Sequence, residues 1–159
     1  MKKYCVLFVC TGNICRSPTA DGVLRKMVAD QGLADVVEVD SAGTHDYHVG
    51  EPPDGRSTEH ALLRGYDLSK LRARQVQADD FERFDVILAL DDGHLRILQK
   101  LCPAKYKTKL HRFTEFCTQH KTHEVPDPYY GAAQGFEHVL DLVEDGCTGL
   151  IDHIRKVRQ

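Results

Sequence analysis

The stretch from Tyr4 to Pro18 constrains the fold of this 159-residue chain more than any other. Residues 4–9 are almost wholly apolar, as expected of a strand that is covered on both faces in a parallel sheet. A loop containing Gly12 follows directly, and Pro18 then suits the first position of a helix, with Ser17 as its N-cap. Because a helix N-terminus presents unpaired N–H groups and a partial positive charge, this stretch predicts a binding site for phosphate or another oxyanion.

The rest of the chain alternates between strand and helix patterns. The expected elements are a helix at 18–31, a strand at 36–40, a loop at 45–54, a short helix at 57–64, a strand at 85–90, a helix at 93–102, a weaker strand at 109–113, a long loop at 114–135 and a closing helix at 136–154. This alternation predicts a single doubly wound α/β domain over residues 1–159. We expect a central four-stranded parallel sheet with helices on both faces and the site at the carboxyl ends of the strands.

The composition is that of an ordinary globular chain, with 28% charged and 42% hydrophobic residues. A net charge of −3 argues against nucleic acid as the main partner. No apolar stretch is long enough to span a membrane, and the short run after Lys3 lacks the cleavage site of a signal peptide. Six cysteines, two of them in the Cys10 loop, are more typical of reduced thiols in the cytoplasm than of a disulfide framework. We therefore expect a cytoplasmic protein with no nucleic-acid or membrane partner.

Three side chains turn the anion site into a candidate catalyst. Cys10 stands at the strand end, where loop N–H groups, the helix dipole and the Arg16 cation favour the nucleophilic thiolate. The planar fork of Arg16 can hold two oxygens of a phosphoryl group, and Ser17 can donate a hydrogen bond to the sulfur. A cysteine at a strand end is often only a small buried hydrophobe, but the presence of Arg16 and Ser17 favours phosphoryl transfer.

No metal site is expected. His111, His120 and His123 come nearest to a cluster, but their spacing matches no helical or CxxC-type ligand set. We therefore predict that the chain uses neither a metal nor another cofactor.

The run CTGNICRSP resembles the signature of the low-molecular-weight protein tyrosine phosphatases, and the resemblance extends along nearly the whole chain. Further segments in the order of that family are Ser41-Ala42-Gly43-Thr44, Pro53-Asp54, Ala73-Arg74-Gln75-Val76 and Asp127-Pro128-Tyr129-Tyr130-Gly131. The resemblance implies a phosphatase acting on tyrosine-phosphorylated proteins, with inorganic phosphate as product or inhibitor, and a monomer that at most self-associates weakly. It implies a phosphate-binding loop formed, besides Cys10 and Arg16, by Thr11, Gly12, Asn13, Ile14, Cys15 and Ser17.

Asp127 is the expected proton donor. An Asp before a Pro is usually a turn former, but a departing phenolate needs a proton and the later hydrolysis needs a base, and one carboxyl group can serve both steps. The resemblance implies this role for Asp127. It also implies that Tyr47, Tyr129 and Tyr130 form aromatic walls around a slot deep enough for phosphotyrosine, with Tyr47 where many relatives have Trp.

Several supporting residues complete the expected site. Asn13 is expected in the left-handed conformation with its amide tied to Ser41, and Arg74 is expected to pair with a carboxylate such as Asp91. Leu71 stands where the family often has a His that braces the loop. Cys15 has two open roles, packing or a reversible disulfide with Cys10, the second suggested by the resemblance.

Three alternative functions remain open from the sequence. A phosphoarginine phosphatase shares the loop, and Thr11 would mark it, whereas Tyr129 and Tyr130 favour an aromatic substrate. A thiol-dependent arsenate reductase would need relay cysteines, which Asp91-Asp92-Gly93-His94 lacks. A module that only binds phosphorylated partners could dispense with the nucleophile.

Overall fold

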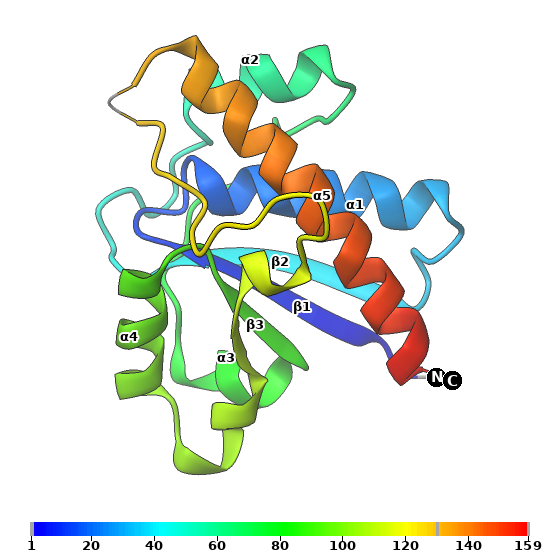
Figure 1. The fold of residues 1–159 in the computed structure, drawn as a ribbon. Helices are drawn as coiled ribbons and strands as arrows, with labels where there is room; N and C mark the ends of the chain where they lie inside the picture. Colours follow the sequence, from blue (N-terminus) through cyan, green and yellow to red (C-terminus); the bar gives the residue numbers. More distant parts are fainter. Residues whose placement is uncertain (1, 130, 159) are drawn as a thin grey trace.

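A four-stranded, all-parallel sheet forms the centre of the computed structural model, which describes residues 2–129 and 131–158 (Figure 1). Its strands are β1 (Tyr4–Cys10), β2 (Val37–Gly43), β3 (Val86–Ala89) and β4 (Leu110–Arg112), in the order β2-β1-β3-β4. The central strand β1 pairs with both neighbours, and Val6 lies opposite Val39 on one side and Val86 on the other. The predicted α/β fold is thus confirmed.

Helices cover both faces of the sheet. Alternate residues of β1 point to opposite sides and are apolar on both, so each face needs a cover. On one face Val6 and Phe8 pack against α1 (Arg16–Asp30) and α5 (Ala133–Val157). α2 (Gly55–Leu63) packs on α5 (Figure 1). On the other face Leu7 and Val9 pack against Phe81 of α3 (Ala78–Arg83) and Leu98 of α4 (Asp92–Leu101). Two short 3₁₀ helices, η1 (Ala104–Lys109) and η2 (Phe113–Phe116), flank β4.

Several element boundaries differ from the sequence predictions, and β2 continues to Gly43, three residues past its expected end. α1 begins at Arg16 with Cys15 as its N-cap residue, and Ser17 does not cap it because its hydroxyl is engaged with Cys10 and Asn13. α3 was not predicted, since its six residues are too few to show a helical period; there Asp80 accepts a hydrogen bond from the N–H of Gln77. α5 begins at Ala133, inside the expected loop.

The carboxyl ends of the strands gather three loops at one end of the molecule (Figure 1). From β1 the chain runs to β2 on one side of β1, and from β2 it crosses to β3 on the other side. A crevice opens where the strand order reverses in this way. The loop after β1, the segment 44–54 after β2 and the segment 117–129 meet there. This topology places the candidate site.

Candidate active site

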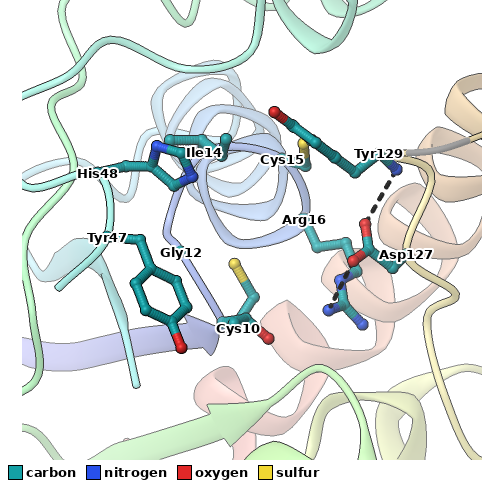
Figure 2. A pocket seen from close by; sticks show the side chains of 10 residues that line it. Cys10, Gly12, Ile14, Cys15, Arg16, Tyr47, His48, Asp127 and Tyr129 are labelled. Atoms are coloured by element: carbon teal, nitrogen blue, oxygen red, sulfur yellow. Dashed lines mark hydrogen bonds and ion pairs between the residues drawn. The ribbon is translucent and has the colours of Figure 1, made fainter. Parts of the chain in front are cut away.

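A pocket of about 390 Å³ opens at this crevice. The loop after β1 forms its floor, while Tyr47 and His48 line one side and Asp127 and Tyr129 the other (Figure 2). Sequence segments more than one hundred residues apart therefore contribute to one cavity. Of the predicted site residues, Asn13, Ser17 and Ser41 lie behind the floor, and Tyr130 lies outside the described residues.

Cys10 lies at the floor of the pocket and is 3% exposed. Its Sγ is 2.9 Å from the Ser17 Oγ, which itself accepts a hydrogen bond of 2.8 Å from the amide Nδ2 of Asn13. Because the Asn13 NH₂ group can only donate, the Ser17 hydroxyl hydrogen is left to point at the sulfur. This arrangement stabilises negative charge on Cys10.

Asn13 shapes the loop from behind. Its φ of 59° is left-handed, and its Oδ1 accepts a hydrogen bond of 3.0 Å from the backbone N–H of Arg74. The expected tie to Ser41 is wrong, because the Asn13 amide is engaged with Ser17 and with the segment at Arg74 instead. Gly43 permits the close approach of β2 to this loop, since a Cβ there would lie 2.7 Å from the carbonyl oxygen of Thr11.

Arg16 lines the pocket and is 4% exposed. Its Nη1 donates to Asp91 Oδ2 at 2.8 Å and to the carbonyl oxygen of Val125 at 3.0 Å. Burial alone would raise the pKa of Asp91, but the N–H of His94 and the charge of Arg16 hold that pKa below its usual value. The prediction that Arg74 pairs with a carboxylate is confirmed, but its partners are Asp40 and Asp80 in place of Asp91.

Arg74 instead bridges two other carboxylates. Its guanidinium lies 3.0 Å from an oxygen of Asp80 and 3.1 Å from an oxygen of Asp40. Arg74 thereby joins β2 to α3 and holds the backbone N–H that binds Asn13. Its part in the site is structural.

Asp127 occupies the opposite side of the pocket from Tyr47 (Figure 2). Its side chain is 49% exposed, its Oδ2 is 3.8 Å from Nη2 of Arg16, and its Oδ1 accepts a hydrogen bond of 3.0 Å from the N–H of Tyr129. The carboxyl group therefore stands above the phosphate-binding loop, residues 10–17, which we call the cradle. It is within reach of an oxygen bound there.

Aromatic side chains flank the mouth. Tyr47 is 67% exposed and stacks on His45 with ring centroids 4.9 Å apart. Across the pocket, the carbonyl oxygen of Tyr129 accepts a hydrogen bond of 2.6 Å from Arg56, whose guanidinium also lies over the Tyr129 ring at 5.6 Å. An apolar ring could enter between Tyr47 and Tyr129.

The second loop cysteine has different surroundings. Burial, followed by the Asp54 carboxylate, raises the pKa of the Cys15 thiol to about 12. All six cysteines are free thiols. A disulfide between Cys10 and Cys15 stays a prediction. Leu71 does not line the pocket and packs against the hydrophobic core.

Sequence reasoning missed four residues of this site: Asp91, His94, His48 and Arg56. Asp91 and His94 could have been found, because they follow β3 directly at the carboxyl edge of a parallel sheet. His48 approaches Gly12 so closely that a Cβ there would lie 2.8 Å from its ring. Neither His48 nor Arg56 stands in a pattern that signals its position.

Neither a metal centre nor a membrane-spanning helix is found within the described residues. Within residues 2–129 and 131–158, no three His, Cys, Asp or Glu side chains are grouped so that they could hold a metal ion. No helix of the described chain has the length and apolar character needed to cross a membrane.

Comparisons with known proteins identify a family that matches nearly the whole chain. The family model described as low molecular weight phosphotyrosine protein phosphatase matches residues 5–159. A low molecular weight protein-tyrosine-phosphatase of Streptomyces coelicolor is 46% identical, with 96% of this chain and 94% of the relative covered. The human low molecular weight phosphotyrosine protein phosphatase is 39% identical over 92% of this chain and 93% of its own. The crystal structure of a protein tyrosine phosphatase from Entamoeba histolytica superposes with a TM-score of 0.95 at 41% identity, covering 99% of this chain and all of that one.

Proposed function

Because this chain belongs to the low molecular weight phosphotyrosine protein phosphatase family, we propose that Cys10, Arg16 and Asp127 carry out its hydrolytic reaction. The enzyme is a protein-tyrosine-phosphatase. The single observation that supports these assignments is that the Cys10 sulfur, the Arg16 guanidinium and the Asp127 carboxyl group converge on one pocket (Figure 2).

In the first step the Cys10 thiolate attacks phosphorus in line. The S–P bond forms as the bond from phosphorus to the phenolic oxygen breaks, and protonated Asp127 gives its proton to that oxygen. Arg16 and the N–H groups of residues 11–17 hold the equatorial oxygens, whose charge they stabilise in the transition state. Nη2 of Arg16 and Oδ2 of Asp127 are 3.8 Å apart, so a single substrate oxygen can contact both groups.

In the second step water hydrolyses the cysteinyl phosphate. Asp127, now a carboxylate, takes a proton from the water while the oxygen of that water bonds to phosphorus. The S–P bond breaks, and inorganic phosphate is released. The Ser17 hydroxyl, 2.9 Å from Cys10 Sγ, stabilises the departing thiolate.

The substrate is a phosphotyrosyl side chain in a protein. Tyr47 and Tyr129 flank the mouth, and Ile14 adds an apolar surface between them and the floor. A phenyl ring would stack there while its phosphate reaches Cys10, whereas a phosphoserine is too short to do so. By resemblance Tyr130 belongs to the same wall. We further propose that the enzyme acts as a monomer, and its six free thiols support a location in the reducing cytoplasm.

The rival activities find less support. The Thr11 hydroxyl, which would mark a phosphoarginine phosphatase, lies 2.8 Å from Nε2 of His94, so it is engaged behind the loop. The turn from Asp91 to His94 holds no cysteine that could relay a disulfide, as an arsenate reductase would need.

The test is phosphate release in EDTA from two peptides that differ only in carrying phosphotyrosine or phosphoarginine. We expect fast release from the phosphotyrosyl peptide by the wild type and none by Cys10→Ser. Preference for the phosphoarginyl peptide would overturn the substrate assignment. Activity of Cys10→Ser would overturn the assignment of Cys10 as the nucleophile.

A further inference from the structure

Behind the cradle, a buried histidine that the reaction above does not use contacts two parts of it. His94 stands in the first turn of α4 and is 3% exposed. Its Nε2 is 2.8 Å from Oγ1 of Thr11 and 3.3 Å from Nη2 of Arg16. One ring nitrogen thus meets both the start of the phosphate-binding loop and the guanidinium.

The surrounding charges determine where the ring proton lies. Arg16 can only donate hydrogen bonds, so a hydrogen on Nε2 would face its N–H groups. On the other side of the ring, Nδ1 lies 3.2 Å from the carboxylate oxygen Oδ1 of Asp91. The proton is therefore favoured on Nδ1, which makes no hydrogen bond but lies near the Asp91 charge, and the Nε2 lone pair faces the two donors.

The ring is also neutral. Burial, followed by the charge of Arg16, lowers the pKa of His94 to about 4. The carboxylates of Asp91 and Asp127 oppose this shift, and His45 adds to it. The N-terminus of α4, with its partial positive charge, further disfavours an imidazolium.

We propose that His94 is a positioning residue, whose Nε2 accepts from Thr11 and Arg16 and so orients the guanidinium fork toward the bound phosphoryl group. This inference rests on the proposed role of Arg16. Asp91 and Val125 hold Nη1 of Arg16, whereas His94 meets Nη2, the nitrogen nearest to Asp127. Holding both nitrogens prevents rotation of the fork, and the contact with Thr11 couples that orientation to the loop backbone.

Side-chain reach provides matched variants for the test. The terminal amide of Gln can place an acceptor where Nε2 lies, whereas that of Asn reaches only as far as Nδ1, and Leu offers none. His94→Gln, His94→Asn and His94→Leu are compared with the wild type and with His123→Leu, a control that changes an exposed histidine. The readouts are kcat and KM for a phosphotyrosyl peptide, calorimetric affinity for phosphate and for vanadate, and the thermal midpoint.

We expect His94→Asn and His94→Leu to lower kcat about tenfold or more and to weaken vanadate binding by a similar factor, because vanadate adopts the trigonal bipyramidal shape of the transition state. Phosphate affinity should change less than threefold. His94→Gln should stay within about threefold of the wild type in every readout.

Wild-type kcat and vanadate affinity in His94→Asn and His94→Leu would overturn the proposal. Equal weakening of phosphate and vanadate together with a lowered thermal midpoint in all three variants would overturn it too, since that pattern indicates a merely structural role. Vanadate binding is measured without turnover, so an inactive wild type or an active Cys10→Ser would count against the proposed function alone.

Discussion

The two halves of the active site are built in opposite ways. The phosphate-binding loop keeps its reacting groups buried, with Cys10 3% and Arg16 4% exposed. Asn13 and Ser17 bond within the loop, and His94 contacts it from behind. The segment that carries Asp127 lies at the surface, where the Asp127 side chain is 49% exposed. Arg56 of α2 reaches across to hold this segment by the carbonyl oxygen of Tyr129.

This difference matches the work that each half does. The cradle binds the same phosphoryl group in every substrate, so a preorganised loop saves the cost of ordering it at each turnover. The Asp127 segment borders the mouth, through which each substrate enters and each phenol leaves. A lightly held segment can adjust to different peptides, provided that it returns Asp127 to the leaving oxygen.

The largest effect is expected at Asp127. Asp127→Ala should lower kcat for phenyl phosphate about 10²- to 10³-fold, because general acid catalysis supplies about that much. The decrease should be smaller for p-nitrophenyl phosphate, whose leaving group needs no proton. Phosphate affinity should stay within about threefold, since the cradle is separate. Steady-state kinetics beside the exposed control Asp46→Ala checks this, and equal loss of turnover and phosphate affinity would contradict the division between the halves.

Next in size is the loss of the support behind the cradle. Asn13→Ala should lower the free energy of unfolding by about 3 kcal/mol, since alanine is strained at a φ of 59° and the N–H of Arg74 loses its acceptor. Asn13→Gly relieves the backbone strain but does not restore the lost hydrogen bonds. Its loss of unfolding free energy should therefore be about 1 kcal/mol smaller than that of Asn13→Ala. Urea unfolding measures both. No loss of stability in either variant would mean that the cradle is less preorganised than the structure indicates.

The third prediction concerns pH. His94 is held neutral in the folded state by a pKa of about 4, while the unfolded chain takes up a proton near pH 6.5. Stability is therefore lost as the pH falls from about 6.5 to 4, by at most about 3 kcal/mol. His94→Gln should lack this component. Urea unfolding at a series of pH values compares the two, and parallel curves for wild type and variant would contradict the buried neutral ring.

The smallest effect is expected on the exposed side. Arg56→Ala removes the hydrogen bond to Tyr129 and the contact with its ring, and should lower kcat about threefold without changing phosphate affinity. Arg83→Ala, which breaks a surface ion pair between α3 and Glu38 of β2, is the matched control. A decrease of a hundredfold or more would show that the Asp127 segment is as tightly organised as the cradle.

Local sequence was sufficient for much of the fold. The buried strands β1 and β3 are continuous apolar runs and the long helix α5 repeats apolar residues at helical spacing, so their positions were predicted closely. The helix α3 was not predicted, because its six residues are too few to show a helical period. The start of α1 was placed two residues late, since Ser17 looks like an N-cap in isolation but its hydroxyl turns to Cys10.

The chemistry-bearing residues of the cradle are adjacent in the chain, so the sequence by itself determined the anion site, the nucleophile and the family resemblance. What holds the cradle comes from distant segments. Only the tertiary structure decided that Arg16 pairs with Asp91, that Asn13 binds the backbone of Arg74 instead of Ser41, and that His94 lies behind both Thr11 and Arg16. The physical reason is that a parallel sheet brings the ends of separate strands to one edge, and the partners that meet there share no spacing along the chain.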